Sequence, residues 1–264
     1  MRDDAIQLEE KRLEGISALA DYQSVHERHR IFPEIFERRG HRTIIDLSAG
    51  VGCTAQRINK DYPAKLICNE ISPAALHLLR DQNLETISFD IDNRDLQFPF
   101  KAASFDAAIS LATIEHLVYG DQFLNEIARI LKDDSYLYLS TPNYAALFYI
   151  PTFLISGRTF HDPLSASPTE RYEFYSHVRY FTFTTLLDYV SSFGFVPETV
   201  YLPLPKESTR YKKLYSNAKW KALFFRFSMR VLYSLGRPRW ASEPVICFKK
   251  GTNAQKGKFR KAIV

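Results

Sequence analysis

Two histidines and an arginine are the side chains of this sequence best suited to acid–base chemistry. His116 follows the apolar run Phe105–Leu111, and His177 and Arg179 lie about 60 residues further on. Histidine can take a proton from a hydroxyl near neutral pH, and arginine can hold an anionic group. We expect His116 to act as a general base, with His177 as the second candidate and Arg179 as a substrate contact. A packing role for His116, and a surface or lid-anchoring role for the other two, remain open.

A second group of residues is suited to binding a nucleoside. The run from Asp46 to Gly52, DLSAGVG, is rich in small residues, which let a ligand approach the backbone. A helix after such a run offers unpaired N–H groups to an anion. Glu70 lies about twenty residues after the loop, where a carboxylate can accept both hydroxyls of a ribose. A tight turn without ligand, or a solvated acid at Glu70, would explain either feature alone, and their combination favours a nucleoside site.

Acidic and apolar residues further along the chain could complete such a site. Asp90 or Asp92 could accept hydrogen bonds from an adenine amino group, with Ile71 and Ile91 against the two faces of the ring. Leu111 ends the next apolar run, one turn before His116. The nucleoside residues and the candidate base are therefore expected on one rim.

The order of apolar runs and helical segments indicates how these residues are positioned. Short β-branched runs alternate with helices of about ten residues, a pattern typical of a doubly wound parallel sheet with helices on both faces. Ligands bind such α/β sheets at the carboxyl ends of the strands, where the strand order reverses. We expect a Rossmann-like, mostly parallel sheet of seven strands. The expected strands are Thr43–Leu47, Lys65–Asn69, Glu85–Phe89, Phe105–Leu111, Ser135–Ser140, Val200–Leu204 and Val245–Lys249.

The complete series of runs resembles the class I S-adenosylmethionine-dependent methyltransferases. The matching runs, in order, are IIDLSAGVG, CNEIS, DIDNRDL, SFDAAISLATIEHL and ARILKDDSYLYLSTPN. The nearest group methylates small molecules, sugars and lipid precursors. The resemblance extends over residues 28–250 and includes HVRYFT at residues 177–182. It implies that the cofactor is S-adenosyl-L-methionine. It also implies that the activity is the transfer of a methyl group to an oxygen of a small molecule, a saccharide or a lipid-linked intermediate.

The resemblance also implies a role for each cofactor residue. The residues around the methionine part of the cofactor would be Asp46, Ser48, Gly50 and Gly52. Glu70 would bind the ribose and Asp92 the adenine, with Ile71 against the ring, and Leu111 would line the sulfonium.

Two positions leave this assignment open. Asp92 is preferred to Asp90 because its spacing to Leu96 fits the family better, and either acid could serve. Ser48 stands where the family usually has glycine, and its Cβ narrows the allowed backbone conformations. An RNA or protein methyltransferase and a non-catalytic, methyltransferase-like binding module are the alternative functions. A nicotinamide dehydrogenase is disfavoured, because the third glycine of its Gly-x-Gly-x-x-Gly run is missing.

The chain is expected to divide into five parts. They are N-terminal helices (1–40), a cofactor-binding core (41–143), a lid or substrate insertion (144–181), a C-terminal part of the fold (182–250) and a basic tail (251–264). Tyr144 opens the apolar stretch YAALFYIPTFLI, which we expect to wall the substrate pocket, with extra core packing as the alternative.

One basic insertion dominates the charge of the chain. Residues 205–240 contain ten Lys or Arg and one Glu, a net charge of +9. Because the formal net charge of the whole chain is +5, the remaining residues carry −4. Residues 219–237 are expected to form an amphipathic helix with a basic stripe opposite apolar residues. Such a helix suits an anionic membrane surface. A solvated helix covering the sheet edge is the alternative, and nucleic-acid binding is disfavoured because no RNA-binding module accompanies the charges.

The remaining composition is ordinary for a globular protein. Cys53, Cys68 and Cys247 have no metal-ligand spacing, so we expect them to be reduced and structural, and we expect no metal ion. The sequence has no apolar run of about 18 residues and no apolar leader. A cytoplasmic protein, peripheral to the inner face of a membrane, is expected.

Overall fold

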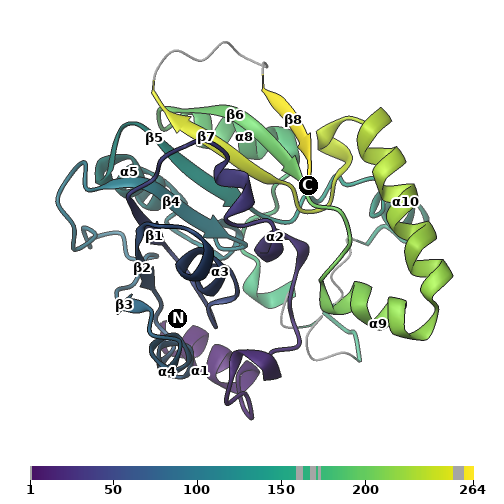
Figure 1. The fold of residues 1–264 in the computed structure, drawn as a ribbon, viewed down its shortest axis with the longest axis horizontal. Coiled ribbons are helices and arrows are strands. Elements are labelled where there is room, and N and C mark those ends of the chain that lie inside the picture. Colours follow the sequence, from purple (N-terminus) through teal and green to yellow (C-terminus); the bar gives the residue numbers. More distant parts are fainter. Residues whose placement is uncertain (1, 159–162, 167–170, 172–173, 252–258) are drawn as a thin grey trace.

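A computed structural model of the chain describes residues 2–158, 163–166, 171, 174–251 and 259–264 (Figure 1). Within these residues the centre is an eight-stranded sheet with the order β3-β2-β1-β4-β5-β7-β6-β8. The strands are β1 Thr43–Asp46, β2 Lys65–Asn69, β3 Glu85–Ile87, β4 Phe105–Leu111, β5 Leu131–Ser140, β6 Phe195–Leu202, β7 Val245–Lys250 and β8 Arg260–Ile263. The predicted Rossmann-like, mostly parallel sheet is confirmed.

The first five strands are parallel, and the strand order reverses at β1. β2 pairs with one side of β1 and β4 with the other, and β7 alone runs antiparallel between β5 and β6. Asp46 at the end of β1 lies in register with Cys68 of β2 and Ile109 of β4. The loop after Asp46 therefore begins at the switch point of the sheet, where α/β proteins bind ligands.

The eighth strand lies in the segment that the sequence presented only as a basic tail. Arg260–Ile263 is too short to show a period of two, and its β-structure comes from parallel pairing with Thr199–Leu202 of β6. Tertiary pairing of this kind overrides a weak local pattern. Residues 252–258 of the tail lie outside the described residues.

Helices lie on both faces of the sheet. They are α1 Arg2–Arg12, α2 Glu27–Arg30, α3 Cys53–Asp61, α4 Pro73–Asp81, α5 Gly120–Ile130, α6 Ile150–Ser156, α8 Phe183–Ser191, α9 Thr209–Asn217 and α10 Lys219–Leu235. Short 3-10 turns cover Leu19–Asp21, Glu34–Phe36, Ile114–His116 and Pro238–Trp240. Local signals set several starts: the Ser72 hydroxyl accepts the Ala75 N–H at 3.2 Å, with Pro73 in the first turn of α4.

Two apolar layers follow from the alternation of side chains along each strand. Ile44 of β1 packs with Phe36 of the N-terminal segment and Ile58 of α3. Its neighbour Ile45 faces the opposite layer, which contains Ile127 of α5 together with residues of α8 and α10. The sheet is thus a central layer, buried on both faces, that holds its strand ends in fixed positions.

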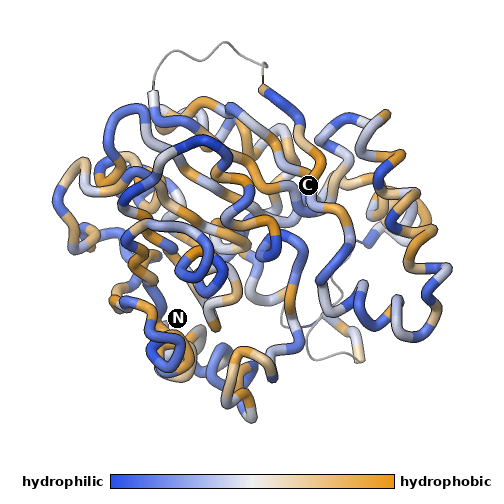
Figure 2. Tube along the Cα trace, viewed as in Figure 1, coloured by the Kyte–Doolittle hydropathy of each residue, from blue (hydrophilic) through white to orange (hydrophobic). Residues whose placement is uncertain are grey.

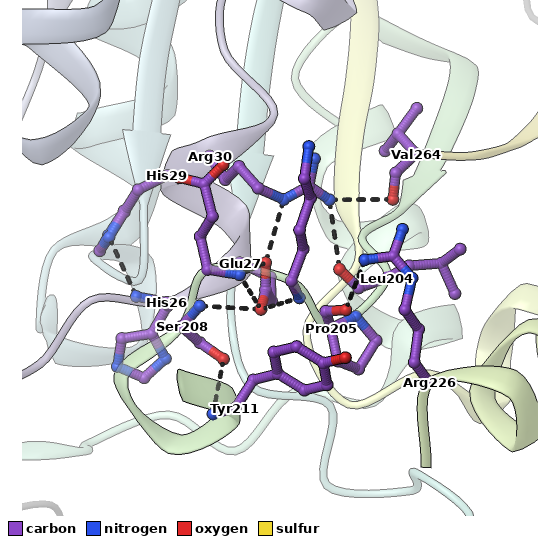
Figure 3. Close-up of polar contacts among 12 residues, drawn as sticks. His26, Glu27, His29, Arg30, Leu204, Pro205, Ser208, Tyr211, Arg226 and Val264 are labelled. Atoms are coloured by element: carbon purple, nitrogen blue, oxygen red, sulfur yellow. Dashed lines mark hydrogen bonds and ion pairs between the residues drawn. The ribbon is translucent and has the colours of Figure 1, made fainter. Parts of the chain in front are cut away.

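The short helix α2 fastens the N-terminal segment to the C-terminal half (Figure 3). The Glu27 carboxylate accepts the Ser208 N–H at 2.8 Å, and the Arg30 guanidinium donates to the Val264 carbonyl at 3.1 Å. Glu27 and Arg30 also form an ion pair at 3.0 Å. Arg226 of α10 donates to the carbonyl of Pro205 at 3.0 Å. These contacts fix the connection from β6 to α9 and attach the middle of α10 to it.

Helix α10 stands at the edge of the molecule (Figure 1). It lies within the basic insertion, and Ala222, Met229 and Tyr233 are its buried residues. Figure 2 shows hydrophobic and hydrophilic stretches alternating along this helix. Most of its large apolar residues are exposed: Trp220, Leu223, Phe224, Phe227, Val231 and Leu235. Among the described residues, no helix combines the length and the apolar character needed to cross a bilayer.

Candidate functional site

The end of β1 carries a buried acid. Asp46 is only 3% exposed, and its burial, together with the nearby charge of Glu70, raises the pKa of its carboxyl to about 7. Burial disfavours the charged form, so a cation placed beside Asp46 would stabilise the carboxylate. The site is therefore arranged to gain most from a ligand that carries positive charge.

The two glycines of the loop serve different purposes. Both have positive φ, 55° at Gly50 and 89° at Gly52. An added Cβ at Gly50 would meet no described atom within 4 Å, so this backbone borders open space. At Gly52 the same Cβ would lie 3.0 Å from Cδ2 of Leu79 and 3.1 Å from Nε2 of Gln82. Gly50 thus leaves room for a ligand, whereas Gly52 lets α3 pack against α4.

Ser48 is the strained residue of the loop. Its φ is 155°, a conformation that residues with a Cβ rarely adopt and that glycine adopts readily. The serine noted in the sequence as a departure from the family therefore has a conformational cost, of about 1–3 kcal/mol by analogy with other sparsely populated backbone states.

Glu70 connects the end of β2 to this loop. Its carboxylate accepts N–H groups from Gly50 at 2.9 Å, Ile71 at 2.8 Å and Ser72 at 3.2 Å. Burial raises the pKa of Glu70, while these backbone donors act in the opposite direction. The carboxylate lies against the Gly50 backbone, beside the open space, and Ile71 next to it is half-buried.

The acid after β3 holds the backbone that follows β4. The Asp92 carboxylate accepts the N–H of Val118 at 3.0 Å and that of Tyr119 at 2.7 Å. Asp90 accepts the Asp92 N–H at 3.0 Å in a local turn. A carboxylate has about four acceptor positions, so Asp92 retains capacity for an adenine amino group. Its structural role, which the sequence did not indicate, is to fix the loop before α5.

Arg179 holds the same loop from the other side. Its guanidinium donates to the carbonyl of Leu117 at 2.9 Å and to that of Val118 at 2.6 Å, and it lies over the ring of Tyr189 at 5.8 Å. Asp92 binds the amides of this segment and Arg179 its carbonyls. Segment 117–119 therefore connects Asp92, after β3, to Arg179 and the region around the histidines.

A buried glutamate lies beneath the two histidines. Glu115 is fully buried, and its burial raises the pKa of its carboxyl to about 7. Oε2 accepts the Thr141 hydroxyl at 2.8 Å. The Glu115 carbonyl accepts the N–H groups of Val178 and Arg179, at 2.9 and 3.0 Å. These two bonds attach the segment around Val178 and Arg179 to the turn after β4.

The two predicted catalytic histidines lie side by side. The rings of His116 and His177 are 4.6 Å apart between centroids, at 69°. His116 Nδ1 lies 3.1 Å from the carbonyl of Ser176, so this nitrogen donates. His177 is buried, and its Nδ1 lies 2.8 Å from the hydroxyl of Tyr144. The structure thus brings together three residues that the sequence placed in two separate segments.

The predicted site residues therefore form two adjoining groups. The cofactor edge contains Asp46, Ser48, Gly50, Glu70, Ile71 and Asp92, with half-buried Leu111 at the end of β4. The second group, around His116, His177, Tyr144 and Arg179, we term the acceptor side. Glu115 and Thr141 belong to it and were not predicted, although Glu115 is adjacent to His116 in the sequence. Part of the predicted lid lies outside the described residues.

Part of the chain is similar to known methyltransferases. A family profile described as a methyltransferase domain matches residues 45–139, from β1 to β5. Ajmaline N-methyltransferase of Rauvolfia serpentina is 30% identical over 104 residues, 38% of this chain and 35% of that protein. The mitochondrial ubiquinone biosynthesis O-methyltransferase of Dictyostelium discoideum is 28% identical over 126 residues, 42% of this chain and 38% of that protein. The chain thus matches little more than a third of either relative.

Solved structures resemble most of the chain. An S-adenosylmethionine-dependent methyltransferase of Thermotoga maritima, described as a possible histamine N-methyltransferase, has a TM-score of 0.56 at 18% identity, covering 85% of this chain and 89% of that one. The [4+2]-cyclase SpnF has a TM-score of 0.58 at 13% identity and covers 94% of both chains. At these identities the likeness concerns the fold, and the two names show that one fold carries different reactions.

Proposed function

We propose that this chain, which carries a class I S-adenosylmethionine-dependent methyltransferase domain, transfers a methyl group from S-adenosyl-L-methionine to an oxygen of a small molecule, a saccharide or a lipid-linked intermediate. The observation that carries the proposal is the meeting of Asp46, Gly50 and Glu70 at the switch point of the matched domain. His116 of the acceptor side lies in the turn after the adjoining strand β4, and the His177 ring lies 4.6 Å from its ring.

The residues at the strand ends fit this cofactor. When bound, S-adenosylmethionine supplies a methyl group on a cationic sulfonium, so the chain has to bind, orient and deprotonate the acceptor. The buried carboxyl of Asp46 and the open space beside Gly50 suit the cationic methionine part. The Glu70 carboxylate has about four acceptor positions and already accepts three backbone N–H groups, so it keeps a lone pair on Oε2 that could accept a hydrogen bond from a ribose hydroxyl. Ile71 and Asp92 would contact the adenine, and Leu111 the sulfonium.

The acceptor side offers a base for a hydroxyl. Because His116 donates from Nδ1 to the Ser176 carbonyl, its neutral ring carries the lone pair on Nε2. That nitrogen can accept the proton of an acceptor hydroxyl. His177, hydrogen-bonded to Tyr144, is the second candidate. Arg179 would contact an anionic group of the substrate with the donors that do not bind Leu117 and Val118.

Replacement of His116 tests the base. His116→Ala should lower turnover by about 10²-fold or more, while the affinity for the cofactor stays within twofold of the wild type. His77→Ala is the matched control, because His77 is exposed and pairs with Asp81 on α4. Unchanged turnover of His116→Ala with bound cofactor would eliminate this role.

The class of acceptor is tested by labelling. Cell extract separated into small-molecule, lipid, RNA and protein pools is incubated with the chain and isotopically labelled S-adenosylmethionine. Label in the small-molecule or lipid pool supports the proposal. Label in RNA or protein identifies the alternative within the family, and tight cofactor binding without label in any pool identifies a binding module.

We further propose that α10 contacts an anionic membrane surface. Phe224, Phe227 and Leu235 are 66, 64 and 85% exposed, on a segment that carries a net charge of +9. A second exposed apolar group lies on α6, where Leu154 and Ile155 are 75 and 87% exposed. The Leu147 N–H donates to the Trp240 carbonyl at 3.2 Å, which attaches the start of that segment to the turn after α10. Exposed aromatic residues beside lysines and arginines suit the interface of an anionic bilayer.

Vesicle co-sedimentation tests this contact. The full chain should bind vesicles of phosphatidylcholine with 30% phosphatidylserine at low salt, and binding should fall in the double variant Phe224→Glu, Phe227→Glu. Leu96→Glu is the control, since Leu96 is an exposed apolar residue in the connection between β3 and β4. Equal binding by both variants, or no binding by the wild type, would contradict the proposal.

A further inference from the structure

Three potential metal ligands converge on the acceptor side. One ligand atom each from Glu115, His116 and His177 lies within 4.8 Å of the other two. Nε2 of His116 is 4.0 Å from Oε1 of Glu115. Two of the three residues are buried and the third is half-buried, so this is not a chance gathering of solvated surface groups. The sequence predicted no metal, because that expectation was based on the spacing of the cysteines.

The carboxylate of Glu115 provides an independent observation. Glu115 is 0% exposed, and its Oε1 has no hydrogen-bond partner among the described residues, whereas Oε2 accepts from Thr141. A buried, unsatisfied acceptor costs about 1–3 kcal/mol, and more when it is charged. In native structures such an atom commonly contacts a bound water or ion, or serves in catalysis. Oε1 is also the oxygen that faces His116.

The outer contacts of the histidines match those of metal ligands. Imidazoles that bind metals usually use their other ring nitrogen to contact a carbonyl, carboxylate or water, which fixes the ring. Nδ1 of His116 donates to the Ser176 carbonyl at 3.1 Å, and Nδ1 of His177 is 2.8 Å from the Tyr144 hydroxyl. Both contacts use Nδ1, and they orient the rings with Nε2 as the ligand nitrogen.

We propose that Glu115, His116 and His177 form a binding site for a divalent transition-metal ion. Two imidazoles and one carboxylate favour Zn²⁺, Mn²⁺ or Fe²⁺ over Mg²⁺ and Ca²⁺. Ligand atoms at about 2.1 Å from one ion lie about 3–3.5 Å apart. The 4.0 Å separation of Nε2 and Oε1 would therefore close by less than an ångström, which side-chain rotation can supply.

Three protein ligands leave a coordination position for an oxygen of the acceptor. An ion held by Glu115 and the two Nε2 atoms would bind an acceptor hydroxyl there and favour the loss of its proton to solvent; in the ion-loaded protein the ion, in place of Nε2 of His116, would promote this deprotonation. This use of the site rests on the proposed function, whereas metal binding itself does not. Asp92 and Arg179, which fix segment 117–119, would keep the ion at a constant distance from the cofactor edge.

Titration with Co²⁺ tests the site without measuring turnover. The full chain, without an affinity tag and dialysed against EDTA, is titrated with CoCl₂ while the visible absorption of bound Co²⁺ is recorded. We expect one ion per chain, displaced by one equivalent of Zn²⁺. The variants Glu115→Gln and His177→Ala should bind Co²⁺ at least 10-fold more weakly. His77→Ala, on the surface of α4, should bind as the wild type does.

Cofactor affinity is measured on the same proteins to show that they are folded. Co²⁺ binding that is absent from the wild type, or equal in all variants that bind the cofactor, would overturn the metal site. Co²⁺ binding without methyl transfer to any pool would leave the metal site standing and reject the proposed function. Undiminished transfer in EDTA would reject the use of the ion in methyl transfer, and the Co²⁺ titration alone would decide whether the ion binds.

Discussion

The cofactor edge and the acceptor side are built in opposite ways. At the cofactor edge Asp46, Glu70 and Asp92 follow three neighbouring strands of one sheet, within 47 residues of each other. On the acceptor side His116 meets His177 across 61 residues, through backbone bonds from Val178 and Arg179 to Glu115. The first group is positioned by strand register, and the second by a few hydrogen bonds to an irregular segment.

The two sides also treat buried charge differently. Burial raises the pKa of both Asp46 and Glu115 to about 7. Glu70 beside Asp46 is compensated by three backbone N–H groups, whereas Oε1 of Glu115 has no partner among the described residues. Under the proposed functions both sides give up stability, the cofactor edge to bind a cationic ligand and the acceptor side to bind an ion.

Asp46→Asn should show the largest effect on stability. A carboxyl with a folded pKa of about 7 and an ordinary value of 3.8 contributes stability that is present below pH 3.8 and is lost as the pH rises through 7. The loss by pH 8 is at most about 4 kcal/mol. Without cofactor, Asp46→Asn should raise the free energy of unfolding in urea by 2 to about 4 kcal/mol at pH 8. The gain should shrink toward pH 4, and a pH-independent difference would contradict the assignment.

Glu70→Gln should chiefly weaken cofactor binding. The variant keeps the side-chain size but replaces one oxygen by a donor, which opposes the N–H groups of Gly50, Ile71 and Ser72 and removes a ribose acceptor. We expect calorimetry to give a Kd for S-adenosylmethionine about 100-fold higher. Glu85→Gln, in an exposed ion pair with Lys65 at the opposite, amino ends of β2 and β3, should leave the Kd unchanged.

Alanine substitutions at Gly50 and Gly52 distinguish a glycine that leaves room for a ligand from one required for helix packing. Gly52→Ala should cost about 2 kcal/mol of unfolding free energy, because its Cβ would meet Leu79 and Gln82 at a positive φ. Gly50→Ala should cost about 1 kcal/mol, from the backbone alone, and should weaken cofactor binding more than Gly52→Ala does. The reverse order in urea denaturation would show that the open space is assigned to the wrong glycine.

Arg179→Lys should disturb the acceptor side only. A lysine cannot donate to the carbonyls of Leu117 and Val118 in the fork geometry of arginine. We expect turnover to fall about 5- to 10-fold, about 1 kcal/mol. The Kd for the cofactor should change less than twofold. A loss of cofactor affinity as large as the loss of turnover would mean that segment 117–119 does not keep the two sides independent.

Ser48→Gly should produce the smallest change, a gain. Relief of the strain at φ 155° is partly cancelled by the greater freedom of glycine in the unfolded chain. The net rise in unfolding free energy should be below about 1 kcal/mol. A loss of stability would indicate that a contact of the Ser48 hydroxyl stabilises the fold by more than the backbone strain at this residue destabilises it.

The contrast between the two sides explains what the sequence could predict. Strand ends and loop residues such as Asp46 and Glu70 are local signals, and strand register then brings them together without further information. The pairing of β8 and the approach of His177 to His116 depend on contacts between distant segments. Glu115 was not predicted because an acid beside a histidine is common in sequences. Its role is suggested only by its burial and its unsatisfied oxygen, which the sequence does not show. The exposure of Phe224 and Phe227 likewise depends on which face of α10 meets the body.

Calorimetric titration of S-adenosylmethionine into the wild type, Glu70→Gln and His116→Ala tests the central claim most directly. A cofactor edge separate from the acceptor side predicts one site in the wild type, about 100-fold weaker binding in Glu70→Gln and wild-type affinity in His116→Ala. No binding to the wild type, or equal affinity in Glu70→Gln and the wild type, would contradict it.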